Sequence, residues 1–134
     1  MMKKCYIDID GVILKRRKEE PVDNVHKLIS FLVSHFDCYW LTTHCKGDSQ
    51  TAIDYLSEYL SEADLQLLQS VKATNWGTFK TDAIDFTSDF YWVDDWAMTA
   101  EKEILSINGK TDSLILVNDE KEDMVDYIIN RLNR

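Results

Sequence analysis

Short apolar runs alternate with longer amphipathic stretches along this chain. The runs cover 5–9, 38–41, 90–93 and 114–117, and they consist almost entirely of apolar and aromatic residues. Runs so short and so apolar are typical of strands buried in a parallel sheet. A weaker run at 71–74 predicts one further, brief strand.

The stretches between these runs carry apolar residues at the three-to-four-residue spacing of amphipathic helices. The expected helical segments are 22–36, 49–60, 61–68, 80–86, 97–107 and 124–132. Ser49 and Ser61 are suitable N-caps for the second and third of these segments. Asp119 and Glu122 have the spacing of a capping box before the last one.

The alternation of strand and helix predicts an α/β fold, a three-layer α/β/α sandwich around a five-stranded, mostly parallel, Rossmann-like sheet. If the first three strands follow one another outward and the chain then returns to the other side of the first, the strand order is 3-2-1-4-5. The carboxyl ends of strands 1 and 4 then flank the switch point, where open α/β sheets place their ligands.

Length and charge limit the class of protein. The 134 residues suffice for a single domain, residues 1–134, and leave no room for a cap domain. The excess of 24 acidic over 15 basic residues opposes non-specific attraction to nucleic acid or anionic lipid. Nucleic acid would therefore have to bind through one local basic patch, which consists of Lys15, Arg16, Arg17 and Lys18.

The lack of a recognisable targeting signal and the pattern of cysteines predict a reducing compartment. No run approaches the roughly 20 apolar residues that cross a bilayer, and no signal-peptide core follows the first residues, so we expect a cytoplasmic protein without a membrane partner. Cys5, Cys38 and Cys45 are odd in number and lack C-x-x-C spacing. They fit neither a disulfide framework nor a zinc site, and we expect reduced thiols.

Four carboxylates follow the two strands that flank the predicted switch point. Asp8 and Asp10 end the first strand, and Asp94 and Asp95 end the strand at 90–93. Four uncompensated negative charges in one crevice would repel one another, so a cation is expected there. Oxygen ligands without His or Cys favour a hard ion, and Mg²⁺ is the expected cofactor.

A hydroxyl and a lysine complete the expected site. Thr42 follows the second strand and could hydrogen-bond a phosphoryl oxygen, although a shift of one residue would give this role to Thr43. Lys80 begins the short helical segment before the strand at 90–93 and could hold the same group. Lys72 is the alternative lysine.

In these motifs the sequence resembles the haloacid dehalogenase superfamily of phosphohydrolases, and most of all its small, uncapped members. Asp8-Ile9-Asp10-Gly11-Val12 corresponds to the first motif, and Thr42, Lys80 and Asp94-Asp95 to the second, third and fourth. The resemblance covers about 4–117. One D-x-D-G sequence is a weak signal, but four motifs in the correct order, three of them at expected strand ends, form a specific one.

The resemblance implies a role for each motif residue. Asp8 would be the nucleophile that forms an aspartyl-phosphate, and Asp10 the general acid and then the general base. Mg²⁺ would bind Asp8, the main-chain carbonyl of Asp10 and Asp94, with Asp95 as a further ligand or as support. The two remaining motif residues, Thr42 and Lys80, would position the phosphoryl group.

The expected substrate is a phosphate monoester in an open site. The connection around 11–21 is long enough only for a short flap, so nothing seals the site from water. An open site suits a bulky substrate such as a phosphorylated polymer end or a protein.

Two other classes of function are alternatives to this prediction. A metal-dependent nuclease of the PIN-like type also gathers carboxylates at strand ends, and needs neither Thr42 nor Lys80. A non-catalytic relative or a receiver-like module would bind without turnover, but receivers place an adjacent acidic pair after the first strand, whereas Ile9 separates the acids here. His44, Cys45, Trp76 and Trp96 are expected near the site, and we assign them no catalytic role.

Overall fold

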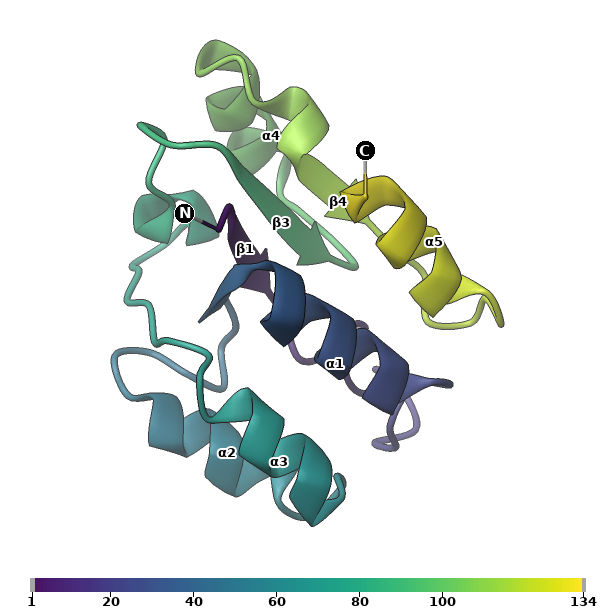
Figure 1. Ribbon diagram of the computed structural model, residues 1–134. Helices are drawn as coiled ribbons and strands as arrows, with labels where there is room; N and C mark the ends of the chain where they lie inside the picture. Colours follow the sequence, from purple (N-terminus) through teal and green to yellow (C-terminus); the bar gives the residue numbers. More distant parts are fainter. Residues whose placement is uncertain (1, 134) are drawn as a thin grey trace.

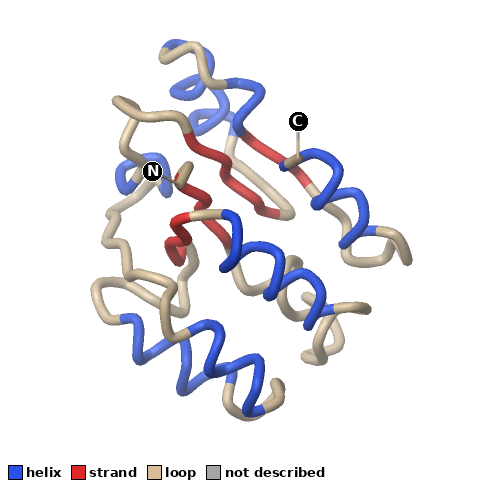
Figure 2. The backbone as a smooth tube through the Cα atoms, viewed as in Figure 1, coloured by secondary structure: helices blue, strands red, loops and turns tan. Residues whose placement is uncertain are grey.

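The computed structural model describes residues 2–133 and contains a four-stranded parallel sheet in the order β2-β1-β3-β4 (Figures 1 and 2). The strands are β1 (Lys4–Ile7), β2 (Asp37–Trp40), β3 (Phe90–Asp94) and β4 (Leu114–Leu116). β1 lies inside the sheet, and its last residue, Ile7, is opposite Trp40 of β2 and Val93 of β3. The fold is α/β and fits a Rossmann-like sandwich, as the alternating pattern predicted.

Within residues 2–133, five α-helices and two short 3₁₀ helices surround this sheet. They are α1 (Val25–His35), α2 (Ser49–Leu56), α3 (Glu62–Leu68), α4 (Thr99–Ile107) and α5 (Met124–Leu132), with 3₁₀ helices at Lys80–Ala83 and Thr111–Ser113. Helix α1 contacts α5 on one side and α3 on the other, and α2 packs against α3 (Figure 1). Helix α4 contacts the 3₁₀ helix at Lys80–Ala83.

Alternation along the strands divides the core between the two faces of the sheet. Cys5 and Ile7 of β1 belong to a large cluster with the apolar faces of α1, α2, α3 and α5. Tyr6, between them, belongs to a second cluster with Trp92 of β3 and Leu105 of α4. Because successive side chains of a strand point to opposite faces, helices must cover both sides of this sheet.

The expected fifth strand at 71–74 does not form. This segment lies beside β2, in the place that the order 3-2-1-4-5 assigns to it, but it forms only a single parallel bridge, between Lys72 and Tyr39. Lys72 donates its N–H to Cys38 O at 3.0 Å and accepts from Trp40 N at 2.8 Å. Two residues later the side chain of Thr74, rather than the backbone, bonds Trp40 O. The pairing ends there, so the sheet has four strands.

Two of the three predicted helix caps differ in the structure. Ser61 caps α3 by accepting from Asp64 N at 3.2 Å, as predicted, but the N-cap of α2 is Asp48 rather than Ser49. Helix α5 begins after Asp123, and no capping box forms at Asp119. Asp119 instead accepts the backbone N–H of Arg16 at 2.7 Å, because the chain before α5 passes next to the flap.

The remaining expectations concern cysteines and membranes. All three cysteines are buried and free. Between residues 2 and 133, no helix combines the length and apolar character needed to cross a bilayer.

Candidate functional site

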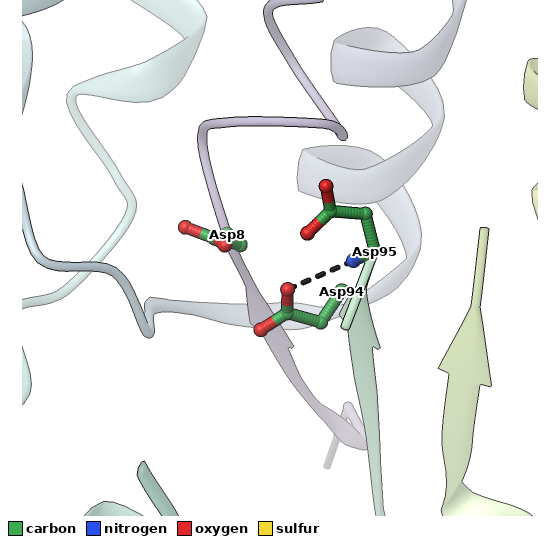
Figure 3. Close-up of side chains that lie close together, drawn as sticks. All are labelled: Asp8, Asp94 and Asp95. Carbon is green, nitrogen blue, oxygen red and sulfur yellow. Dashed lines mark hydrogen bonds between the residues drawn. The ribbon is translucent and has the colours of Figure 1, made fainter. Parts of the chain in front are cut away.

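Three carboxylates meet at the carboxyl end of the two central strands (Figure 3). Asp8 directly follows β1, Asp94 is the last residue of β3, and Asp95 is the next residue. Each offers an oxygen within 4.8 Å of the oxygens of the other two. The in-register pairing of Ile7 with Val93 places these side chains together, as the topological argument from the sequence predicted.

Asp94 lies at the centre of this group and is almost completely buried, with 1% of its surface exposed. Its Oδ1 accepts the backbone N–H groups of Asp95, at 2.8 Å, and Trp96, at 3.3 Å. Its Oδ2 accepts from Lys80 Nζ at 2.7 Å and from the indole N–H of Trp92 at 3.1 Å. Burial, together with the negative charge of Asp8, raises the pKa of Asp94. These four donors fix the orientation of the carboxyl group.

Lys80 bridges two of the carboxylates. Its Nζ lies 2.7 Å from Asp94 Oδ2 and 3.1 Å from Asp8 Oδ2. Burial alone would lower the pKa of Lys80, but the charges of Asp8 and Asp94 outweigh it and raise that pKa. The alternative, Lys72, is paired with Asp37 at 3.0 Å. The structure therefore brings Lys80, and not Lys72, to the carboxylates.

A buried glutamate on α4 holds the backbone of this lysine. Glu101, 3% exposed, accepts the N–H of Lys80 at 2.7 Å with one oxygen and the N–H of Met98 at 2.8 Å with the other. It thereby ties the 3₁₀ helix at Lys80–Ala83 to the start of α4. Glu101 was not among the residues expected at the site, since a single acid on an amphipathic helix gives no signal of its contacts.

Asp95 faces the flap, the segment 11–21. Arg16 binds it with two parallel hydrogen bonds, one from Nε at 2.5 Å and one from Nη2 at 2.7 Å. Burial alone would raise the pKa of Asp95, but the Arg16 guanidinium outweighs it and lowers that pKa. The base of the flap is fixed, because Val12, Ile13 and Leu14 are fully buried in the core.

An open cleft of about 650 Å³ separates the basic patch from the segment 117–122, with Asp95 among its lining residues. Half of the patch is already paired: Lys15 with Glu20 and Asp23, at 3.5 Å each, and Arg16 with Asp95. Arg17 and Lys18 are exposed. The opposite wall carries three acids, Asp119, Glu120 and Glu122, so the cleft has mixed charge rather than the uniform positive charge of a polyanion groove.

Asp10 lies beside these carboxylates but its side chain turns to a different partner. Its Oδ2 is 2.9 Å from Nε2 of His44, and the imidazole stacks on the ring of Tyr55 of α2 at 3.9 Å. The side chains of Asp10 and His44 are 31% and 28% exposed. His44 was expected near the site without a role, because its sequence neighbours do not reveal that its ring meets the first motif.

The two threonines of the second motif differ in accessibility. Thr42 is fully buried, and its Oγ1 accepts the N–H of His44 at 3.3 Å. Thr43 is exposed in the same turn. Of the remaining candidates, Trp96 donates its backbone N–H to Asp94 but its side chain is 65% exposed. The Trp76 ring lies under the Lys46 ammonium at 3.9 Å, and Cys45 is buried.

The donor set fits a hard divalent cation. Asp8, Asp94 and Asp95 supply carboxylate oxygens, which Mg²⁺ prefers, and include no soft ligand. Lys80 and Arg16 compensate two of the three negative charges, which leaves an excess of one. A divalent cation bound to these oxygens would change the net charge of the group from −1 to +1, so the site would then attract an anionic ligand.

Comparison with known proteins does not identify a family for this chain. Comparison of the chain with protein-family models, with curated proteins and with solved structures finds no match. The likeness to the haloacid dehalogenase superfamily stays a prediction that depends on the four motifs.

Proposed function

We propose that this chain is a Mg²⁺-dependent phosphohydrolase that cleaves phosphate monoesters through an aspartyl-phosphate at Asp8. One observation carries the proposal: the Lys80 ammonium bridges Asp8 and Asp94, at 3.1 and 2.7 Å, where β1 and β3 end side by side. A nucleophilic carboxylate, a cation for the phosphoryl oxygens and an oxygen-rich metal site thus occupy one crevice. These are the parts that in-line phosphoryl transfer requires.

In the first half of the reaction, Asp8 attacks phosphorus. A bond forms between the Asp8 carboxylate oxygen and phosphorus, and the bond from phosphorus to the alcohol oxygen breaks. Asp10 gives its proton to the departing oxygen and becomes a carboxylate. Lys80, held by Glu101 through its backbone, places its charge beside the phosphoryl oxygens.

In the second half, water replaces the alcohol. Asp10, now a carboxylate, takes a proton from the water whose oxygen attacks phosphorus, and the bond to Asp8 breaks to release inorganic phosphate. Asp8 is again a carboxylate and Asp10 again carries its proton. The cycle consumes one water and leaves the protein unchanged.

The carboxylates of Asp8, Asp94 and Asp95 would hold the metal, with the main-chain carbonyl of Asp10 as the further ligand that the family resemblance implies. When bound, Mg²⁺ would supply charge neutralisation at the phosphoryl oxygens and at the attacking carboxylate. The exposed hydroxyl of Thr43 and the buried one of Thr42 are both candidates for a phosphoryl contact. The open cleft beside Asp95 supports a bulky phosphorylated substrate.

The test is a Mg²⁺-dependent screen of phosphate esters with wild type, Asp8→Asn and Asp10→Asn. Asp112→Asn is the matched control, because Asp112 is exposed at the opposite end of the sheet, before β4. We expect phosphate release by wild type and the control, and its loss in both site variants. An unchanged rate in Asp8→Asn would refute the covalent scheme.

A second measurement separates the phosphatase from its rival. Beryllium fluoride with Mg²⁺ should form an adduct at Asp8, visible by ¹⁹F NMR in wild type and absent in Asp8→Asn. Cleavage of phosphodiesters without such an adduct would indicate a nuclease of the PIN-like type instead.

A further inference from the structure

We propose that His44 is a positioning residue that sets which oxygen of Asp10 delivers the proton, and that the site is thereby suited to phosphate esters of aliphatic alcohols. Such esters release an alkoxide, which leaves readily only when it is protonated. The inference rests on the proposed function, because it assigns a task to His44 in that reaction.

Two contacts hold the His44 ring, and a third holds its backbone. Nε2 lies 2.9 Å from Asp10 Oδ2, and one ring face stacks on Tyr55 with an interplanar angle of 8°. The backbone N–H of His44 is bonded to the hydroxyl of Thr42, which is fully buried. A side chain held in this way keeps its hydrogen-bonding atom in place, which a free surface histidine would not do.

The loop that carries His44 is itself anchored. Thr42 and Cys45 form an antiparallel bridge across the turn, and the buried Cys45 thiol donates to Asp48 O at 3.2 Å. Gly47 N bonds Thr74 O at 2.8 Å, next to β2. Helix α2 starts directly after this loop and brings Tyr55 back over the imidazole. The second motif thus positions the acid of the first motif through His44.

The hydrogen bond to His44 fixes the rotation of the Asp10 carboxyl group and holds Oδ2. An imidazole that donates its Nε2–H to Oδ2 occupies that oxygen and leaves Oδ1 as the oxygen free to deliver a hydrogen. The leaving oxygen then meets a donor, and the Asp10 proton moves to that oxygen as the phosphorus–oxygen bond breaks. Without His44 the carboxyl group could rotate and present either oxygen, so fewer encounters would be productive.

Accessibility agrees with this role. About a third of the Asp10 side chain is exposed (31%), so an alcohol oxygen can reach it from solvent. The His44 side chain is covered on one face by Tyr55 and remains 28% exposed. The pair therefore borders the space in which a leaving group would lie.

The test compares two substrates that differ in their need for a proton. An alkyl phosphate needs the general acid, whereas 4-nitrophenyl phosphate releases a stable anion and hardly needs it. His44→Phe keeps the stack on Tyr55 and removes the donor, and His44→Gln restores an N–H near the position of Nε2. His35→Phe is the matched control. His35 is the last residue of α1, and its ring also stacks on an aromatic ring, that of Phe31.

We expect His44→Phe to lower kcat/KM for the alkyl ester by about 10-fold or more, a part of the roughly 10²–10⁴-fold that general acid–base catalysis supplies. The loss for 4-nitrophenyl phosphate should be much smaller, His44→Gln should recover part of the alkyl activity, and His35→Phe should match wild type. In wild type, long-range ¹H–¹⁵N spectra should show His44 protonated at Nε2, and this signal should shift in Asp10→Ala.

Equal losses on both substrates, or no loss on either, would overturn the role of His44 while an Asp8-dependent phosphatase remained. A His44 imidazole protonated only at Nδ1 would overturn it as well. A wild-type protein without activity on any phosphate monoester would instead refute the proposed function, and this inference with it.

Discussion

Gly11 lies directly against the side chain of Asp95. A β-carbon at position 11 would fall 2.3 Å from Asp95 Oδ2 and 2.7 Å from Asp95 Cβ, distances that real β-carbons do not adopt. Gly11 also has φ +84°, in the left-handed region. Both conformation and space therefore require glycine at the turn that follows Asp10, where the flap passes over the carboxylates.

Gly11→Ala should lower both stability and metal binding. The left-handed conformation alone costs a non-glycine residue about 1–2 kcal/mol, and the collision must also displace Asp95. Gly109→Ala provides the matched control, because Gly109 has φ +69° with nothing within 4 Å of its would-be β-carbon. Urea unfolding and Mg²⁺ titration should show a stability loss in both variants and weaker Mg²⁺ binding in Gly11→Ala alone.

Arg16→Ala should strengthen Mg²⁺ binding. Arg16 occupies both oxygens of Asp95, so a metal that uses Asp95 must compete with the guanidinium. The arginine side chain is 52% exposed, and an exposed ion pair is worth roughly 0.2–1 kcal/mol, which corresponds to a gain of up to about fivefold in Mg²⁺ affinity.

Calorimetric titration with Mg²⁺ is the measurement for Arg16. Arg17→Ala serves as the control, since Arg17 is exposed and forms no ion pair within residues 2–133. If both variants changed the affinity equally, the effect would come from net charge and not from release of Asp95.

Much of this fold could be predicted because its strands are short, apolar and buried on both faces. The apolar pattern alone predicted strands at 5–9 and 90–93 and placed them side by side at the switch point of the sheet. The segment 71–74 was harder, because its single bridge to Tyr39 depends on how far the loop after α3 stays beside β2. Edge pairing of this kind is decided by tertiary contacts rather than by local pattern.

The candidate site was predictable where its residues end strands. Asp8 and Asp94 follow from topology, since parallel strands bring their carboxyl ends to one edge. The partners of Asp10 and Asp95 were not predictable, because His44 and Arg16 reach them from loops whose paths no periodicity specifies. The sequence therefore predicted where the acids gather and that Lys80 reaches them, but not that Arg16 binds Asp95 and His44 binds Asp10.

The three thiols should be unreactive in the folded protein. Burial raises the pKa of Cys5, of Cys45 and of Cys38, the last to about 12, so hardly any thiolate is present at pH 8. A disulfide reagent such as DTNB should label none of them quickly in buffer and all three in denaturant. Rapid labelling of Cys45 alone would indicate that the loop carrying His44 opens in solution.

Lys80→Met should destabilise the metal-free protein strongly, and Mg²⁺ should restore part of the loss. Removing the ammonium leaves Asp8 and Asp94 buried without their cation, and breaking a buried pair in this way typically costs about 3–5 kcal/mol. Lys27→Met removes an exposed pair with Asp126, which is worth about 0–1 kcal/mol, and is the control. Unfolding curves with EDTA and with Mg²⁺ measure both effects.

Because a divalent cation held by the same carboxylates replaces the missing charge, the gain in unfolding free energy on adding Mg²⁺ should be larger in Lys80→Met than in wild type or Lys27→Met. An equal gain in all three proteins would mean that Mg²⁺ binds somewhere other than between Asp8 and Asp94.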